Sequence, residues 1–108
     1  MIDEQDCIEL MQLEELIEEI TDKLNSSITV ECNLEIILLG ELDLFPEIRD
    51  TLSLKNKFIK LRQIKPAVKN WVDGWIKAEA EIRQLTHKKK QVEGKRDSKK
   101  KVFAITPR

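Results

Sequence analysis

The charged residues of this sequence are segregated along the chain. Residues 1–50 contain 15 Asp or Glu residues and two basic residues, whereas residues 51–108 contain 17 Lys or Arg residues and five acidic ones. Each half therefore repels itself, and the two halves attract each other. Solvation of charged surfaces explains the abundance of charge but not this separation. We expect acidic and basic elements to lie together, either within one molecule or between two.

The length of the chain limits the fold to one modest hydrophobic core. A chain of 108 residues buries roughly two thirds of its unfolded surface, which suits one small domain. No apolar stretch approaches the roughly 20 residues that span a bilayer. The first residues, MIDEQDC, are acidic where a signal peptide is basic. We therefore expect an intracellular protein, cytoplasmic or, in a eukaryote, nuclear, and we do not expect membrane association.

Residues 3–24 show the pattern of an amphipathic helix. Apolar residues recur every three or four positions, which places them on one face, and glutamates occupy the opposite face. The apolar residues are Leu10, Leu13, Ile17, Ile20 and Leu24. The sequence Asn-Ser-Ser at residues 25–27 then predicts the end of this helix.

Residues 28–39 are ambiguous between a strand and a helix. Apolar residues at every second position from Ile28 to Leu38 give the alternation of a half-buried strand. As a helix, the same residues would be apolar almost all the way round, which suits only a helix that is buried on most sides. A strand needs a partner, for which residues 102–106 or a second molecule are the candidates. We favour the strand slightly and keep the helix as the alternative.

Two further helices are predicted after this segment. Pro46 suits the first turn of a helix over residues 46–63, and Pro66 predicts a break at Lys65 before a helix over residues 66–93. The last helix carries an apolar stripe at alternating spacings of four and three, as in a coiled coil, interrupted by one lysine. The stripe consists of Trp71, Trp75, Ala78, Ile82, Leu85, Lys89 and Val92.

Trp71 and Trp75 lie one helical turn apart and allow three interpretations. Both can anchor the core of a small domain, and tryptophan is also enriched at protein interfaces. Their rings can instead stack on nucleic-acid bases. Asp73 and Gly74 between them would also suit a turn, because glycine weakens a helix by about 1 kcal/mol relative to alanine. We favour a continuous helix and a role in the core.

Residues 94–108 are predicted to form a flexible basic tail with a short apolar end, because residues 88–101 read KKKQVEGKRDSKKK. The terminal VFAITPR is most simply a frayed end. As a hypothesis, Val102, Phe103 and Ile105 form a docking peptide that adds a strand to the sheet of a partner. The candidate contacts for nucleic acid or for an acidic partner are Lys88, Lys89, Lys90, Lys95, Arg96, Lys99, Lys100 and Lys101.

The sequence contains no recognisable catalytic, cofactor or metal motif. His87 is the only imidazole and lies in the cationic stretch THKKK, and three glycines cannot build a phosphate-binding loop. Cys7 and Cys32 form no metal-ligand or disulfide pattern, so we expect two reduced thiols. We therefore expect a protein that is not an enzyme and that holds no cofactor or metal.

Together these patterns predict a mainly α-helical fold, a small helical hairpin or coiled-coil-like bundle in which residues 1–93 form a single domain. An α+β fold is the alternative if residues 28–39 form a strand. We interpret the chain as a protein–protein interaction or assembly subunit, an adaptor that forms a homo-oligomer or joins a larger complex. The alternative is a nucleic-acid-associated protein that uses the basic C-terminal helix and tail. The predicted partner interface consists of Leu10, Leu13, Ile17, Ile20, Trp71, Trp75, Ile82 and Leu85.

Overall fold

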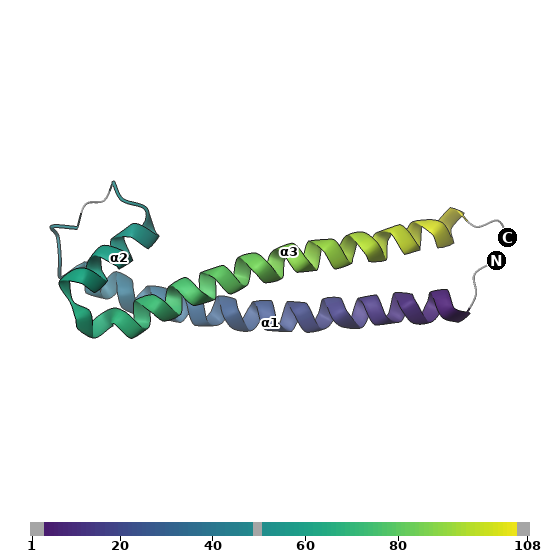
Figure 1. Cartoon of the computed structure of the whole chain (residues 1–108), viewed down its shortest axis with the longest axis horizontal. Helices are drawn as coiled ribbons and strands as arrows, with labels where there is room; N and C mark the ends of the chain where they lie inside the picture. The colour runs from purple at the N-terminus through teal and green to yellow at the C-terminus, as the bar shows by residue number, and fades with distance from the viewer. Residues whose placement is uncertain (1–3, 49–50, 106–108) are drawn as a thin grey trace. The chain divides into compact units, whose positions relative to one another are not determined.

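The computed structural model describes the backbone of residues 4–48 and 51–105, and their side chains as far as Lys100. These residues form three α-helices and one short 3-10 helix: α1 (Glu4–Leu42), α2 (Leu54–Ile64), η1 (Pro66–Val68) and α3 (Lys69–Ile105) (Figure 1). No strand occurs in the described ranges, which confirms the predicted mainly α fold. The chain divides into two compact units, unit 1 (Met1–Asn25 and Arg83–Arg108) and unit 2 (Ser26–Ile82).

The predicted strand over residues 28–39 is wrong, because these residues lie inside α1. A helix satisfies its backbone hydrogen bonds internally, whereas the described residues offer no partner strand. The stripe of the preceding turns also continues at spacings of three and four through Ser27, Glu31, Leu34 and Leu38. Leu38 is fully buried and Leu34 packs against the same core. The apolar spacing of three and four residues, which belongs to a helix, therefore describes this segment better than the alternation of every second residue, which belongs to a strand.

The predicted end of the first helix at residues 25–27 is also wrong. Ser27 is buried, and its hydroxyl donates a hydrogen bond to a carboxylate oxygen of Glu81 at 3.3 Å. A serine that finds such a partner on another helix does not compete for the backbone of its own helix. The helix therefore continues through the polar sequence and ends only at Leu42.

The second helix begins at Leu54, later than the predicted start at Pro46. The Ser53 hydroxyl accepts a hydrogen bond from the backbone N–H of Asn56 at 3.3 Å, which makes Ser53 the N-cap. The predicted break at Lys65 is confirmed, because α2 ends one residue earlier and η1 follows directly.

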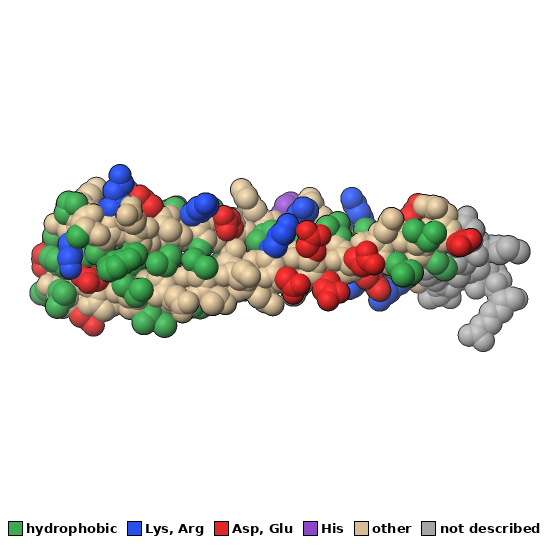
Figure 2. Space-filling model, turned by 90° about the horizontal axis from the view of Figure 1, so that it is seen from below, with side chains coloured by type: hydrophobic (Ala, Val, Ile, Leu, Met, Phe, Trp, Pro, Cys, Tyr) green, Lys and Arg blue, Asp and Glu red, His purple; other side chains and the backbone are tan. Residues whose placement is uncertain are grey.

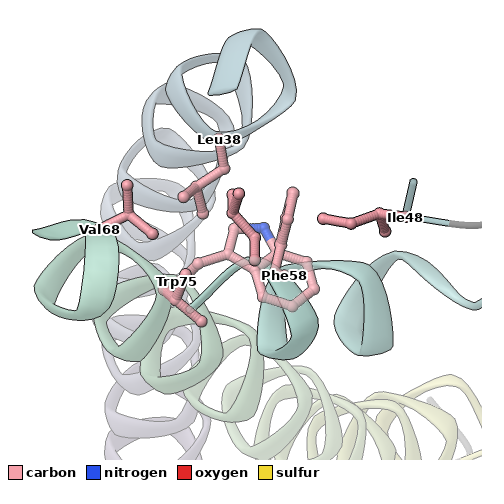
Figure 3. Close-up of a cluster of buried hydrophobic side chains, with 7 residues drawn as sticks. Leu38, Ile48, Phe58, Val68 and Trp75 are labelled. Carbon is pink, nitrogen blue, oxygen red and sulfur yellow. The ribbon is translucent and has the colours of Figure 1, made fainter. Parts of the chain in front are cut away.

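Unit 2 is built around one hydrophobic core, to which every helix of the unit contributes (Figure 3). Two ion pairs surround it: Arg62 contacts Asp73, and the Lys65 ammonium lies 2.6 Å from a carboxylate oxygen of Glu41. These pairs connect the end of α2 to both long helices of the unit. The buried residues of the core are Leu38, Ile48, Phe58, Leu61, Val68, Val72 and Trp75.

Unit 1 consists of the first turns of α1 and the last turns of α3, which lie antiparallel (Figure 1). Its core contains buried Ile17, Ile20 and Val92. Residues 94–105 are helical, contrary to the predicted flexible tail. The reason is electrostatic, because acidic residues of α1 lie beside the basic run and relieve its self-repulsion. The pairs are Lys99 with Glu9 at 2.5 Å and with Asp6 at 3.8 Å, and Lys100 with Glu14 at 3.4 Å.

Candidate functional site

Most of the predicted interface residues are used inside the chain. Trp75 is buried in the core of unit 2, whereas Trp71, one turn earlier on α3, is 41% exposed. The remaining side chains are buried or half-buried: Leu10, Leu13, Ile17, Ile20, Ile82 and Leu85. Of this set, Trp71 is the residue whose side chain is exposed.

The predicted basic contact residues differ in their surroundings. Lys88, Lys90 and Lys95 are exposed, and Lys89 is half-buried. Lys99 and Lys100 pair with acidic residues of α1, and the Arg96 Nε donates a hydrogen bond to its neighbour Asp97 at 3.1 Å.

The C-terminal docking peptide falls at the limit of the described structure. The side chains of Lys101, Val102, Phe103 and Ile105 lie outside the described residues. Their backbone belongs to α3, so these four residues form a helix and not the extended strand of the hypothesis.

Large aliphatic side chains remain exposed on the part of α1 that belongs to unit 2. At about 100° per residue, Val30 and Ile37 lie on one side of the buried stripe and Ile28 and Leu39 on the other. Ile36 lies opposite the stripe. Ile36 is 71% exposed, and the other four are 40% to 49% exposed. On the face shown in Figure 2, hydrophobic side chains gather over unit 2. We call these five residues the apolar α1 surface.

The sequence prediction did not assign the apolar α1 surface to an interface. The signal was nevertheless present, because a helix over residues 28–39 is apolar nearly all the way round. One side of this surface adjoins a shallow groove of about 360 Å³ that is lined by Ser26, Ser27, Val30, Gly74, Lys77, Ala78 and Glu81. Small residues on both helices leave this groove open beside Val30.

A larger groove lies on unit 1. It measures about 780 Å³, and Leu13 and Leu16 form its apolar floor. Gly94 and Ser98 keep it open, since a Cβ atom at Gly94 would meet nothing within 4 Å. The other lining residues are Glu9, Gln12, Gln91, Lys95 and Lys99. The sequence analysis did not predict this groove, because it placed Gly94 in a flexible tail outside the folded domain.

The histidine and the two cysteines of the chain lie at separate exposed positions. His87 is exposed, and its Nε2 lies 3.1 Å from the side-chain nitrogen of Gln91. Cys7 and Cys32 are exposed free thiols. Within the described residues, no group of three or more His, Cys, Asp or Glu side chains is placed to hold a metal ion. In the same part of the chain, every helix is too short or too polar to cross a membrane.

One carboxyl group of unit 2 has a perturbed environment. Partial burial raises the pKa of Glu31 above its ordinary value, and the carboxylates of Glu35 and Glu79 raise it further. Glu31 occupies the position between Ser27 and Leu34 in the stripe of α1. A carboxylate in this position opposes close packing of the helices when it is charged.

Comparison of the chain with protein-family models, with curated proteins and with solved structures found no match.

Proposed function

We propose that this chain is a non-enzymatic protein–protein interaction or assembly subunit, and that the apolar α1 surface binds its partner. The observation that carries the proposal is the exposure of five large aliphatic side chains along one helix, with Ile36 exposed at 71%. A helix that is apolar on several sides is typical of a helix buried among other helices. Unit 2 covers only one of these sides.

The five side chains of the apolar α1 surface leave apolar area in contact with water. Complete burial of one isoleucine or leucine side chain stabilises a complex by about 1.5–3 kcal/mol before the costs of association. Apolar patches of this kind on a folded protein mark interaction sites. An amphipathic helix of a partner would cover the surface with residues spaced three and four apart. Trp71, on α3 of the same unit, supplies an exposed aromatic side chain of the type that dominates binding energies.

The experiment compares two substitutions in unit 2 that add the same charge. Ile36→Glu places a carboxylate on the apolar α1 surface, whereas Gln63→Glu places one at an exposed polar position of α2. Each chain is captured from cells that express it, and the associated proteins are identified by mass spectrometry. We expect a partner that is retained by the wild type and by Gln63→Glu and is lost from Ile36→Glu. Identical partners for all three chains would contradict the proposal, as would a wild-type chain that stays monomeric and captures nothing specific.

A second candidate function is association with nucleic acid, which the basic helix favours. Residues 83–105 contain nine basic and two acidic residues, and Lys88, Lys90 and Lys95 are exposed. The ion pairs of Lys99 and Lys100 with α1 weigh against it, because they already satisfy two of these cations.

Titration of a labelled DNA duplex of random sequence tests this candidate. Replacement of Lys88, Lys89, Lys90, Lys99, Lys100 and Lys101 by glutamine should weaken binding and flatten its dependence on salt. Glutamine at the exposed Lys55, Lys60, Lys69 and Lys77 of unit 2 is the control. Equal affinity of the six-lysine variant and the wild type would rule out this use of α3.

A further inference from the structure

Unit 1 joins two helices of opposite charge. Residues 4–25 of α1 contain eight acidic residues and one basic residue, whereas residues 83–105 of α3 contain nine basic and two acidic residues. Any face that exposes both helices is therefore acidic along one side and basic along the other. Such a face is complementary to itself, provided that a second copy places its acidic helix over the basic helix of the first.

The groove of unit 1 is such a face. Its floor is apolar, and its two rims come from different helices. On α1, Gln12 lines the groove, and exposed Glu15 and Glu19 continue the same rim at spacings of three and four residues. Glu19 also pairs with Lys23 in the next turn, at 3.3 Å. Glu15 therefore carries the net negative charge of this rim.

The opposite rim is basic. On α3, Gln91 and Lys95 line the groove, and exposed Lys88 continues the rim three residues before Gln91. Neither Lys88 nor Lys95 has an ion-pair partner among the described residues. Both cations of this rim are available to a second molecule.

The charges of the two rims lie at matching heights along the helices. The ion pair between Glu9 and Lys99 sets a common level for α1 and α3. Since the helices are antiparallel, α1 rises from this level towards higher residue numbers and α3 towards lower ones. At 1.5 Å per residue, the axial distances from this level are about 6 Å to Lys95, about 9 Å to Glu15, about 16 Å to Lys88 and about 15 Å to Glu19.

We propose that the groove of unit 1 is covered by unit 1 of a second copy of this chain, related by a two-fold axis parallel to the helices. A rotation about this axis preserves height, so Lys95 of one copy faces Glu15 of the other, and Lys88 faces Glu19. Each helix then has antiparallel neighbours of opposite charge, as in a four-helix bundle. The floors formed by Leu13 and Leu16 of both copies meet in its centre.

Electrostatics selects this arrangement over the other face-to-face one. A two-fold axis perpendicular to the helices would place α1 on α1 and α3 on α3, so that like charges would face each other across the interface. The inference rests on the proposed function as an assembly subunit and specifies a partner for unit 1. It makes no use of the apolar α1 surface.

A charge exchange between two copies tests the inference. The substitutions Lys95→Glu and Glu15→Lys each create like-charge contacts at two symmetric places. Each variant alone should therefore dimerise about tenfold or more weakly than the wild type. An equimolar mixture restores opposite charges at both places. At one place the glutamate introduced in one chain faces the lysine introduced in the other, and at the second place the unchanged Glu15 and Lys95 face each other. We expect light scattering to report a dimer for the wild type and for the mixture, and mainly monomer for each single variant.

Two further variants separate the groove from its surroundings. Lys100→Glu is the matched control, because Lys100 pairs with Glu14 of its own chain and neither residue lines the groove. It should leave the dimer unchanged. Gly94→Gln fills the groove at a helical position with open space, so it should give a monomer without loss of helicity. Circular dichroism checks that each variant is folded.

The outcomes distinguish this inference from the proposed function. A wild-type chain that is monomeric over the whole accessible concentration range overturns the inference, whereas the capture experiment decides the proposed function separately. A dimer that resists Lys95→Glu, Glu15→Lys and Gly94→Gln but is lost with Ile36→Glu also overturns it and supports the apolar α1 surface instead. A dimer that forms in the mixture of Lys95→Glu and Glu15→Lys, but not with either variant by itself, supports the two-fold arrangement.

Discussion

Phe58 meets the indole ring of Trp75 edge-on, with the ring centroids 4.9 Å apart and the ring planes at 87°. Phe58 lies on α2 and Trp75 on α3, and both side chains are buried in the core of unit 2. This geometry sets the positive edge of one ring against the negative face of the other. The pair therefore holds the short α2 against a long helix.

Phe58→Ala should destabilise the protein by about 3–5 kcal/mol, because it leaves a cavity beside Trp75 and removes the ring contact. Urea unfolding followed by tryptophan fluorescence measures the loss. Ile36→Ala is the control, since a mostly exposed side chain should change stability by less than about 0.5 kcal/mol. Equal losses for the two variants would mean that the core is not where the structure places it.

Gly94→Ala should stabilise α3 by about 0.5–1 kcal/mol, because alanine favours the helix and the new Cβ meets nothing within 4 Å. Gly74→Ala should stabilise less, since its Cβ would lie 3.2 Å from Cδ1 of Leu34, which must move. Thermal unfolding of both variants gives the comparison. A larger gain for Gly74→Ala would show that the helices do not approach closely there.

Ser53→Ala should cost about 1 kcal/mol, because it leaves the Asn56 N–H at the start of α2 without its capping acceptor. Ser26→Ala is the matched control, since Ser26 lies inside α1 and is exposed. Chemical denaturation of the two variants measures the difference. If both substitutions have the same effect, Ser53 is not the cap of α2.

Glu31→Gln should stabilise the protein at neutral pH by about 0.2–0.5 kcal/mol, because it removes a charge that is partly buried and that lies four residues from the like charge of Glu35. The pKa of Glu31 is raised, so the folded state binds its proton more tightly than the unfolded state. The penalty in the wild type is therefore present at neutral pH and disappears as the pH falls below the raised pKa.

Melting temperatures across this pH range check the sign. The advantage of Glu31→Gln over the wild type should shrink as the pH is lowered, whereas Glu47→Gln, at an exposed position in the connection before α2, should show no comparable change. An advantage that grows towards low pH would contradict the assignment.

Local patterns were sufficient where the structure depends on neighbours in sequence. The stripe of residues 10–24 identified a helix because three- and four-residue spacing is a property of the helix itself. The break at Lys65 was predictable because a proline restricts the residue before it. The cap at Ser53 is equally local, and its serine was a readable signal that the prediction from Pro46 passed over.

Tertiary contacts decided the features for which one pattern fits two structures. The alternation of residues 28–39 suits a strand, and the packing of Leu34 and Leu38 on the core of unit 2 favours the helix. Trp71 and Trp75 are equivalent in sequence, yet the approach of Phe58 buries one and leaves the other exposed.

The sequence alone showed the charge segregation and predicted that acidic and basic elements attract each other. It did not predict which elements meet, or where. Glu9 and Lys99 are 90 positions apart in the chain and pair within unit 1, so a basic run that would repel itself in isolation becomes the end of a helix. Local sequence determines the sign of each charge and the helical preference of each turn. The partner of a charge is decided by tertiary structure, because it depends on which distant segment of the chain packs against it.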